Sequence, residues 1–109
     1  MLFRSAAVEA FLAEGNRPRG LICMNDRIAW GAYQALAEHG LRVPDDVAVV
    51  SFDGSDLAGW LRPSLTTVLL PYGELGARAI EMLLEPEPTT PMPVRVPMPL
   101  LSGGSVANS

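Results

Sequence analysis

The sequence predicts an α/β fold, in which a partial, doubly wound parallel sheet is flanked by helices. Short apolar runs typical of buried strands alternate with longer segments of helical periodicity, and this order favours α/β layering. Apolar residues make up 49% and charged residues 18% of the 109 positions, which is typical of a folded domain with a core. Polar residues directly follow the two strongest strand candidates, as they do in sheets that bind ligands at one edge.

The first half of the chain carries three predicted elements. Residues 5–14 are rich in alanine and predict a short helix. Residues 20–24 form a short apolar run (GLICM), which predicts a strand buried on both faces. A second helix is predicted over residues 27–39, with Asp26 as its N-cap and Gly40 as the C′ residue that follows its end.

The second half adds two strands and a helix. Residues 47–52 form another apolar run and residues 65–70 are rich in β-forming side chains, so each segment predicts a strand. Between these strands, residues 57–61 predict a short helical turn. Residues 74–84 predict a third helix, whose apolar face contains Leu75, Ala79, Ile80 and Leu83.

The C-terminal segment is dominated by proline. Six of the ten prolines lie within residues 86–99, so residues 85–93 are expected to form a proline-rich surface loop. Apolar residues then alternate with other residues over 94–100. Because proline cannot donate a ladder hydrogen bond, this segment predicts only an edge or irregular strand at the periphery.

The elements predict one domain without an internal repeat. The strands at 20–24 and 47–52 are expected to be adjacent and parallel, because the helix between them is long enough for a right-handed crossover. Two or three buried strands are few for a doubly wound sheet, and the chain opens directly on a helix. We therefore expect either that residues 1–109 are a C-terminal fragment of a larger domain or that Met1 is a late start codon.

Charge and residue counts exclude several classes of function. The net charge is −4, and all eight basic residues are arginine, so the chain has no basic footprint for nucleic acid. The absence of lysine excludes Schiff-base and P-loop lysines. The lone Cys23 excludes an internal disulfide and a cysteine zinc cluster, and it favours a reducing, cytoplasmic setting. We expect no cofactor, no metal and no membrane-spanning segment.

Two polar pairs follow the strands at equivalent places. Asn25 and Asp26 come after the first predicted strand, and Asp53 and Gly54 come after the second. Open α/β sheets bind ligands outside the carboxyl ends of their strands, where amide and carboxylate groups can hydrogen-bond a polyol or a base. A purely structural alternative stays open, in which Asp26 caps a helix and Asp53 forms an Asx turn.

The helix at 27–39 has more apolar surface than one sheet can cover. One apolar stripe suffices for packing on a sheet, yet Trp30 and Tyr33 form a second stripe on nearly the opposite side. The loop after the second strand also presents the bulky pair Trp60 and Leu61. These four side chains either meet in a two-fold subunit interface or are buried within one chain by the adjacent loop, and both interpretations stay open.

Four motifs occur in order along the chain: MNDRIAWGA from Met24, GLRVPDDV from Gly40, SFD from Ser51 and PSLTTV from Pro63. Through these motifs, residues 20–84 resemble the C-terminal part of the effector-binding domain of LacI/GalR-family bacterial transcriptional regulators. Residues 102–107 (SGGSVA) resemble the closing segment of the same domain.

The resemblance implies a lobe of a periplasmic-binding-protein-like (type I) fold. In that family a small molecule binds between two α/β lobes and alters DNA binding by a separate N-terminal helix-turn-helix, which is absent from this chain. The implied effector is sugar-like or nucleobase-like. Asn25 and Asp53 match effector-contacting positions, and Tyr72 is expected to form an apolar wall of the pocket.

The resemblance also implies a homodimer that reaches operator DNA only through the absent N-terminal domain. Trp30 and Leu61 match positions at the family's subunit contact.

The expected function is ligand sensing and dimerisation in a transcriptional regulator, with repression as its expected effect. Two alternatives are a solute-binding protein of a sugar transport system and an enzyme of doubly wound fold, although no catalytic constellation is present. The chain departs from the family pattern at Ser51, Gly54 and Gly103.

Overall fold

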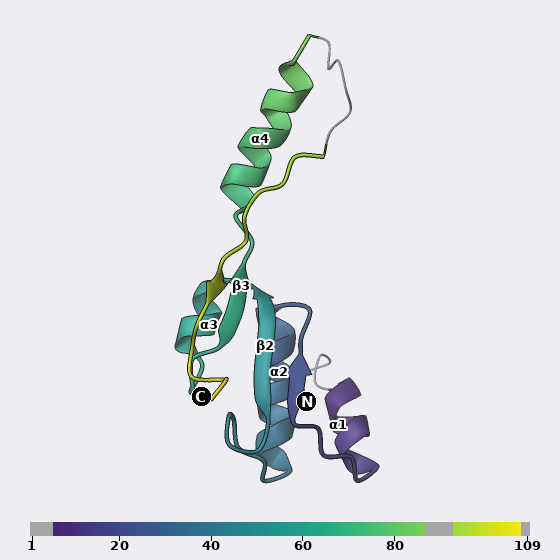
Figure 1. Cartoon of the computed structure of the whole chain (residues 1–109). Coiled ribbons are helices and arrows are strands. Elements are labelled where there is room, and N and C mark those ends of the chain that lie inside the picture. Colours follow the sequence, from purple (N-terminus) through teal and green to yellow (C-terminus); the bar gives the residue numbers. More distant parts are fainter. Residues whose placement is uncertain (1–5, 87–92, 108–109) are drawn as a thin grey trace.

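The computed structural model describes residues 6–86 and 93–107 and has the predicted α/β order (Figure 1). The elements in chain order are α1 (Ala6–Ala13), β1 (Gly20–Ile22), α2 (Asp26–Glu38), β2 (Ala48–Asp53), α3 (Asp56–Trp60), β3 (Thr66–Leu69), α4 (Tyr72–Leu84) and β4 (Leu100–Leu101). Ser5, at the start of the first predicted helix, and most of the predicted loop at 85–93 lie outside the described residues.

The four strands form one sheet in the order β1-β2-β3-β4. β1 and β2 are adjacent and parallel, with Leu21 opposite Val49, which confirms the predicted pairing. β3 continues the parallel sheet beside β2, whereas β4 pairs antiparallel with β3, so the sheet is mixed. Residues 93–99 have no regular secondary structure, and the strand begins only at Leu100, because the prolines before it cannot donate ladder hydrogen bonds.

The core lies between the sheet and α2. Along β2, Val49 and Ser51 are buried, whereas the intervening Val50 and Phe52 are partly exposed. Ala32 and Leu36 of α2 are buried in the same core, as the predicted inner stripe requires. This alternation shows that α2 covers one face of the sheet and leaves the opposite face more open.

The C-terminal segment joins β2 and β3 through Ser105. The Ser105 hydroxyl accepts a hydrogen bond from the Thr66 backbone N–H at 2.8 Å and donates one to the carbonyl of Val49 at 2.5 Å. Gly103 passes so close to the chain before β3 that a Cβ would lie 2.5 Å from the carbonyl oxygen of Ser64. The segment that resembles the family's closing motif therefore has a structural role in the sheet.

Helix α2 begins differently from the prediction. Its N-cap is Asn25, whose side-chain oxygen accepts a hydrogen bond from the Ile28 backbone N–H at 2.9 Å. The prediction of Asp26 as the cap was therefore wrong, since Asp26 is the first helical residue and is completely buried. At the other end, Gly40 follows the C-cap with φ of 71°, which confirms its predicted place.

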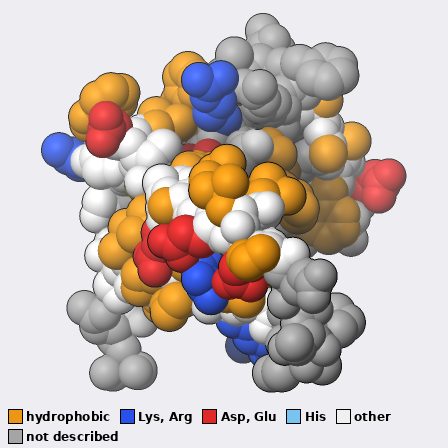
Figure 2. Space-filling view, turned by 90° about the horizontal axis from the view of Figure 1, so that it is seen from above, with side chains coloured by type: hydrophobic (Ala, Val, Ile, Leu, Met, Phe, Trp, Pro, Cys, Tyr) orange, Lys and Arg blue, Asp and Glu red, His pale blue; other side chains and the backbone are white. Residues whose placement is uncertain are grey.

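Helix α4 projects away from the sheet and forms the long end of the molecule (Figure 1). It has the predicted amphipathic pattern, but none of its residues is buried, and Leu83 is 79% exposed. Seen from above, the hydrophobic side chains near the centre of the face lie among acidic and basic ones (Figure 2). Within the described residues, therefore, no other element covers the apolar face of α4. None of the described helices is long and apolar enough to cross a membrane.

Candidate functional site

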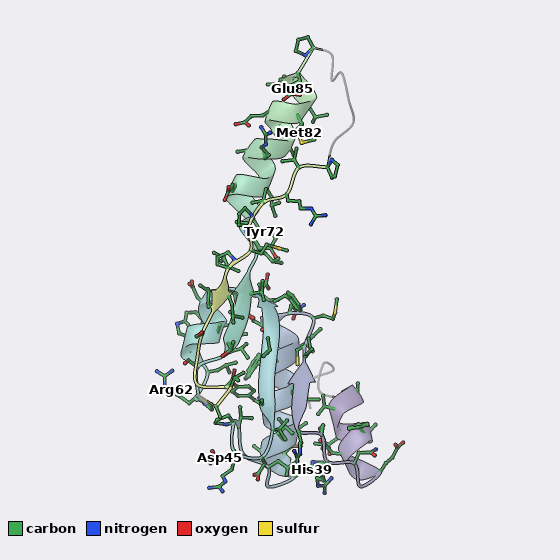
Figure 3. The ribbon with its side chains drawn as sticks, viewed as in Figure 1. His39, Asp45, Arg62, Tyr72, Met82 and Glu85 are labelled. Atoms are coloured by element: carbon green, nitrogen blue, oxygen red, sulfur yellow. The ribbon has the colours of Figure 1, made fainter. Side chains whose placement is uncertain are left out.

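Three predicted ligand-binding residues lie at the carboxyl ends of three neighbouring parallel strands. Asn25 follows β1, Asp53 is the last residue of β2, and Tyr72 follows β3 as the first residue of α4. Tyr72 lies at the narrow connection between the sheet and α4 (Figure 3). Because parallel strands end on the same side of a sheet, all three residues occupy the edge at which open α/β sheets bind ligands.

The structure brings Asp53 and Tyr72 into direct contact. The Tyr72 hydroxyl donates a hydrogen bond to Oδ1 of Asp53 at 2.5 Å. This hydrogen bond to the Asp53 carboxylate, together with some desolvation and the nearby negative charge, raises the pKa of Tyr72 above its ordinary value. The Tyr72 side chain is otherwise open, since the residue is 63% exposed, so its ring can still face a bound molecule.

Asn25 occupies the same edge but also has a structural role. Its Oδ1 atom is engaged by the backbone N–H of Ile28 as the helix cap. Within residues 6–86 and 93–107, its Nδ2 group donates to no protein acceptor. Asn25 can therefore present an amide donor to a ligand while its oxygen fixes the start of α2.

Asp53 adopts a strained backbone conformation. Its φ is 144°, which side-chain-bearing residues rarely adopt, and Gly54 follows with φ of 73°. The positive φ of Gly54 favours glycine, and a Cβ there would also come within 3.0 Å of the Cα of Leu69. Gly54, where the chain departs from the family pattern, thus lies in the tight turn after β2 and has a backbone conformation that favours glycine.

The strain at Asp53 predicts an unusual order of variant stabilities. Asp53→Gly and Asp53→Ala both remove the carboxylate, but only alanine retains a Cβ in the strained conformation. We expect the glycine variant to be more stable by about 1 kcal/mol in urea unfolding followed by circular dichroism. At Asp56, in the first turn of α3, the same pair should show the reverse order. The same order at both positions would contradict strain at Asp53.

Sequence reasoning missed the side chain that organises this edge, which is Asp26. Its Oδ1 atom accepts hydrogen bonds from the hydroxyls of Ser51 at 2.5 Å and Thr67 at 2.8 Å. Its Oδ2 atom accepts from the backbone N–H of Ser55 at 2.8 Å and from the Ser55 hydroxyl at 2.7 Å. Asp26 thus joins α2 to β2, β3 and the turn before α3.

Burial and hydrogen bonding act in opposite directions on the Asp26 carboxyl. Burial by itself raises its pKa, but the hydrogen bonds from Ser51, Ser55 and Thr67 outweigh burial and lower the pKa below its ordinary value. The carboxylate therefore remains charged at neutral pH. One signal in the sequence could have indicated this network, namely the polar Ser51 between the apolar residues Val50 and Phe52 of β2.

The four predicted interface residues fall into two groups. Trp30 on α2 is 38% exposed, and Trp60 at the end of α3 is 73% exposed. Tyr33 and Leu61 instead pack partly against the core, and the Tyr33 hydroxyl donates to the carbonyl of Pro63 at 3.0 Å. Within the described part of the chain, Tyr33 and Leu61 are thus partly buried. The side chains of the two tryptophans remain exposed and can contact another subunit.

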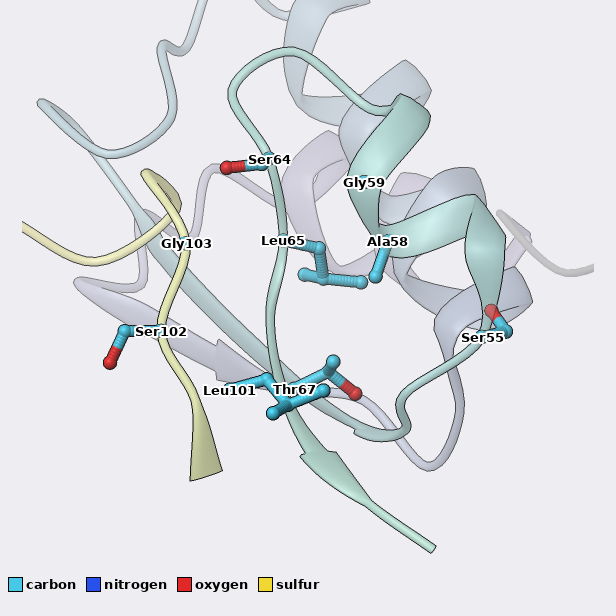
Figure 4. A pocket seen from close by; sticks show the side chains of 9 residues that line it. All are labelled: Ser55, Ala58, Gly59, Ser64, Leu65, Thr67, Leu101, Ser102 and Gly103. Carbon is cyan, nitrogen blue, oxygen red and sulfur yellow. The ribbon is translucent and has the colours of Figure 1, made fainter. Parts of the chain in front are cut away.

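A separate pocket of about 210 Å³ opens between α3, β3 and the C-terminal segment (Figure 4). Hydroxyl-bearing and small side chains line it: Ser55, Ala58, Gly59, Ser64, Leu65, Thr67, Leu101, Ser102 and Gly103. None of the three predicted ligand-binding residues lines this pocket, although Ser55 and Thr67 also bond Asp26. It therefore lies beside the strand-end site and is distinct from it.

The family of periplasmic binding protein-like domains matches residues 2–106. The ribose operon repressor of Haemophilus influenzae is 41% identical over 78 residues, which cover 72% of this chain and 24% of the repressor. The chain thus spans about a quarter of the length of that curated relative.

Two solved structures share the fold. A LacI-family transcriptional regulator from Arthrobacter sp. FB24 in complex with lactose is 32% identical, with a TM-score of 0.82 over 95% of this chain and 41% of that chain. The lac repressor dimer bound to operator and the anti-inducer ONPF is 27% identical, with a TM-score of 0.87 over 96% of this chain and 37% of that chain. The chain therefore belongs to the periplasmic binding protein-like domain family, and the proteins to which it is similar include LacI-family transcriptional regulators.

Proposed function

We propose that this chain is the ligand-sensing and dimerising part of a LacI/GalR-like transcriptional repressor that responds to a small sugar-like or nucleobase-like effector. The observation that carries the proposal is the Asp53 carboxylate, paired with Tyr72 at the edge where three parallel strands end. The similar proteins are repressors, which favours a regulator over a transport binding protein. Such a regulator acts in the cytoplasm, where its operator lies.

The strand-end residues suit a ligand that carries hydroxyls or ring N–H groups. Oδ1 of Asp53 is engaged by Tyr72, but a carboxylate accepts several hydrogen bonds, so Oδ2 can bind a second donor. Asn25 adds an amide donor through Nδ2. The ring of Tyr72 supplies an apolar wall against a pyranose or purine face.

Two connections leave the sheet side by side near this site. The chain passes from β3 through Pro71 into α4, and it returns through Pro99 into β4. The Leu69 backbone N–H donates to the carbonyl of Pro99 at 2.9 Å, which ties the outgoing and returning segments together. Because the apolar face of α4 is uncovered by the described residues, we propose that α4 and residues 93–99 pack in the other lobe. The effector would then bind next to the crossing point between lobes.

We propose that the two tryptophans anchor a two-fold interface. Trp30 and Trp60 expose large apolar surfaces, while Tyr33 and Leu61 are partly buried against the core. In the assembled regulator, operator DNA is contacted by a separate DNA-binding domain. This division of roles agrees with a net charge of −4 and the absence of lysine in this chain.

The effector site is tested by Asp53→Ala in the full-length regulator. Loss of a hydrogen-bonding carboxylate from a polar ligand site costs about 1–3 kcal/mol, so we expect binding to weaken by roughly tenfold or more. Isothermal titration calorimetry with D-ribose, D-glucose and guanine as probes measures this change. Asp56→Ala is the matched control, because it removes an exposed carboxylate three residues away. Equal affinities of Asp53→Ala and the wild-type protein would refute the assignment.

A further inference from the structure

We propose that Asp26 is a positioning residue of the effector site, whose buried carboxylate holds the Asp53–Ser55 turn so that the Asp53 side chain stays at the strand end. This inference rests on the proposed role of Asp53 and extends it to a residue that does not touch the ligand. In this proposal Asp26 is not a local helix cap. Its carboxylate instead links α2 to β2, β3 and the turn before α3.

Each oxygen of the Asp26 carboxylate accepts two hydrogen bonds. Ser51 and Thr67 both donate to Oδ1, and the backbone N–H and hydroxyl of Ser55 both donate to Oδ2. Asp26, Ser51 and Thr67 are buried, so the two hydroxyl donors to Oδ1 would lose their partner without replacement by bulk solvent. Only an ionised carboxylate accepts all four hydrogen bonds, because an amide or a protonated acid would present a hydrogen to one of these donors.

Two connections transmit this anchoring to Asp53. The first is direct, since Ser55 lies two residues after Asp53 and is bonded through both its backbone and its side chain. The second runs through Thr67, whose hydroxyl oxygen accepts from the Gly54 backbone N–H at 3.2 Å while its hydrogen is donated to Asp26. Of the two residues that follow Asp53, Ser55 therefore bonds Asp26 directly and Gly54 is linked to it through Thr67.

The strain at Asp53 explains why such an anchor is needed. A residue with φ of 144° persists only where its surroundings define the conformation more strongly than the backbone opposes it. On the other side, the carbonyl of Asp53 accepts a hydrogen bond from the Leu70 backbone N–H at 3.1 Å. With the turn released from Asp26, the backbone of Asp53 can relax and carry its carboxylate away from Tyr72.

Thr67→Val and Ser51→Ala form a matched pair that tests the proposal. Each variant removes one hydrogen bond to Oδ1 of Asp26, but only Thr67 also holds the Gly54 N–H. In the full-length regulator we expect Thr67→Val to weaken binding of the responsive probe among D-ribose, D-glucose and guanine by roughly fivefold or more. Ser51→Ala should change it less than about twofold at a similar loss of stability. Equal effects of the two variants on affinity would overturn the proposal.

A double-mutant cycle identifies the residue through which the network acts. If Thr67 acts through Asp53, adding Thr67→Val to Asp53→Ala produces little further loss of affinity. A full additional loss in the double variant would mean that the network acts elsewhere, and it would overturn the proposal.

A measurement without ligand separates this inference from the proposed function. The chain has two tyrosines, and selective isotope labelling lets nuclear magnetic resonance follow the titration of each one. Because the Asp53 hydrogen bond raises the pKa of Tyr72, Thr67→Val should bring that pKa back toward its ordinary value, while Ser51→Ala and the Tyr33 signal remain unchanged. An unaltered Tyr72 titration in Thr67→Val would overturn the positioning role. Failure of Asp53→Ala to change ligand binding would instead refute the role of Asp53 in the effector site, while the Tyr72 titration would still report whether the network holds the turn.

Discussion

Replacement of Asp26 by asparagine is expected to destabilise the chain by about 3 kcal/mol or more, although the two side chains have nearly the same shape. Hydrogen bonds to a buried charged group contribute about 1.5–3 kcal/mol each, and a donor left unsatisfied adds about 1–3 kcal/mol. In either orientation, the asparagine amide sets an N–H group against donors, either those of Ser55 or those of Ser51 and Thr67. Urea unfolding of the full chain, followed by circular dichroism, measures the difference.

Asp45→Asn is the matched control for this variant. Asp45 is an exposed carboxylate that approaches Arg42 at 3.9 Å, and exposed ion pairs contribute about 0–1 kcal/mol. If Asp26 were only a helix cap, its replacement by alanine would cost about 1 kcal/mol, and asparagine, itself a good cap, would cost less. A loss of 1 kcal/mol or less for Asp26→Asn would therefore support the cap interpretation and contradict the network.

The same carboxylate predicts a specific pH dependence. The pKa of Asp26 in the folded chain lies below its ordinary value of 3.8, so the unfolded state binds a proton more readily than the folded state. Its stabilising effect is complete above that ordinary value and is lost as the pH falls through the lowered pKa of the folded chain. The difference in unfolding free energy between wild type and Asp26→Asn should consequently shrink below about pH 4. A difference that does not change with pH would contradict a charged Asp26.

Replacement of either exposed tryptophan by aspartate is expected to convert the full-length regulator from dimer to monomer. Trp60→Asp and Trp30→Asp place a charge at the proposed centre of a two-fold interface, where each residue acts twice. Central aromatic residues contribute about 2 kcal/mol or more each, so a symmetric pair weakens dimerisation by about a thousandfold. Sedimentation velocity measures the oligomeric state. Operator affinity should fall with it, because paired DNA-binding domains read two half-sites.

Phe11→Asp provides the control for adding a charge at an exposed aromatic residue. Phe11 lies on α1 and is exposed, but it belongs to neither group of interface residues. Leu61→Asp is a less selective test, because Leu61 packs partly against the core and its replacement is expected to destabilise the fold as well. Variants of Trp30 and Trp60 that stay dimeric, or that lose their circular dichroism, would place the interface elsewhere.

The sequence by itself determined the elements and the parallel pairing of β1 with β2. Each depends on near neighbours: apolar runs predicted β1 and β2, helical spacing predicted α2 and α4, and the prolines limited β4 to a short strand at the sheet edge. The strand-end positions of Asn25 and Asp53 also followed from this order. Local propensity could not separate Asn25 from Asp26 as the cap, because both residue types favour that position.

The tertiary structure decided what these residues contact. The Asp26 network joins residues 25, 29 and 41 positions apart, and the hydrogen bond between Tyr72 and Asp53 joins residues 19 apart. No local pattern encodes such partners. Likewise, the periodicity of α4 predicted an apolar face but not that the described residues would leave it uncovered. Helix and strand formation depends on side chains a few positions apart, whereas the partner of a buried carboxylate is set by which strands meet when the sheet assembles.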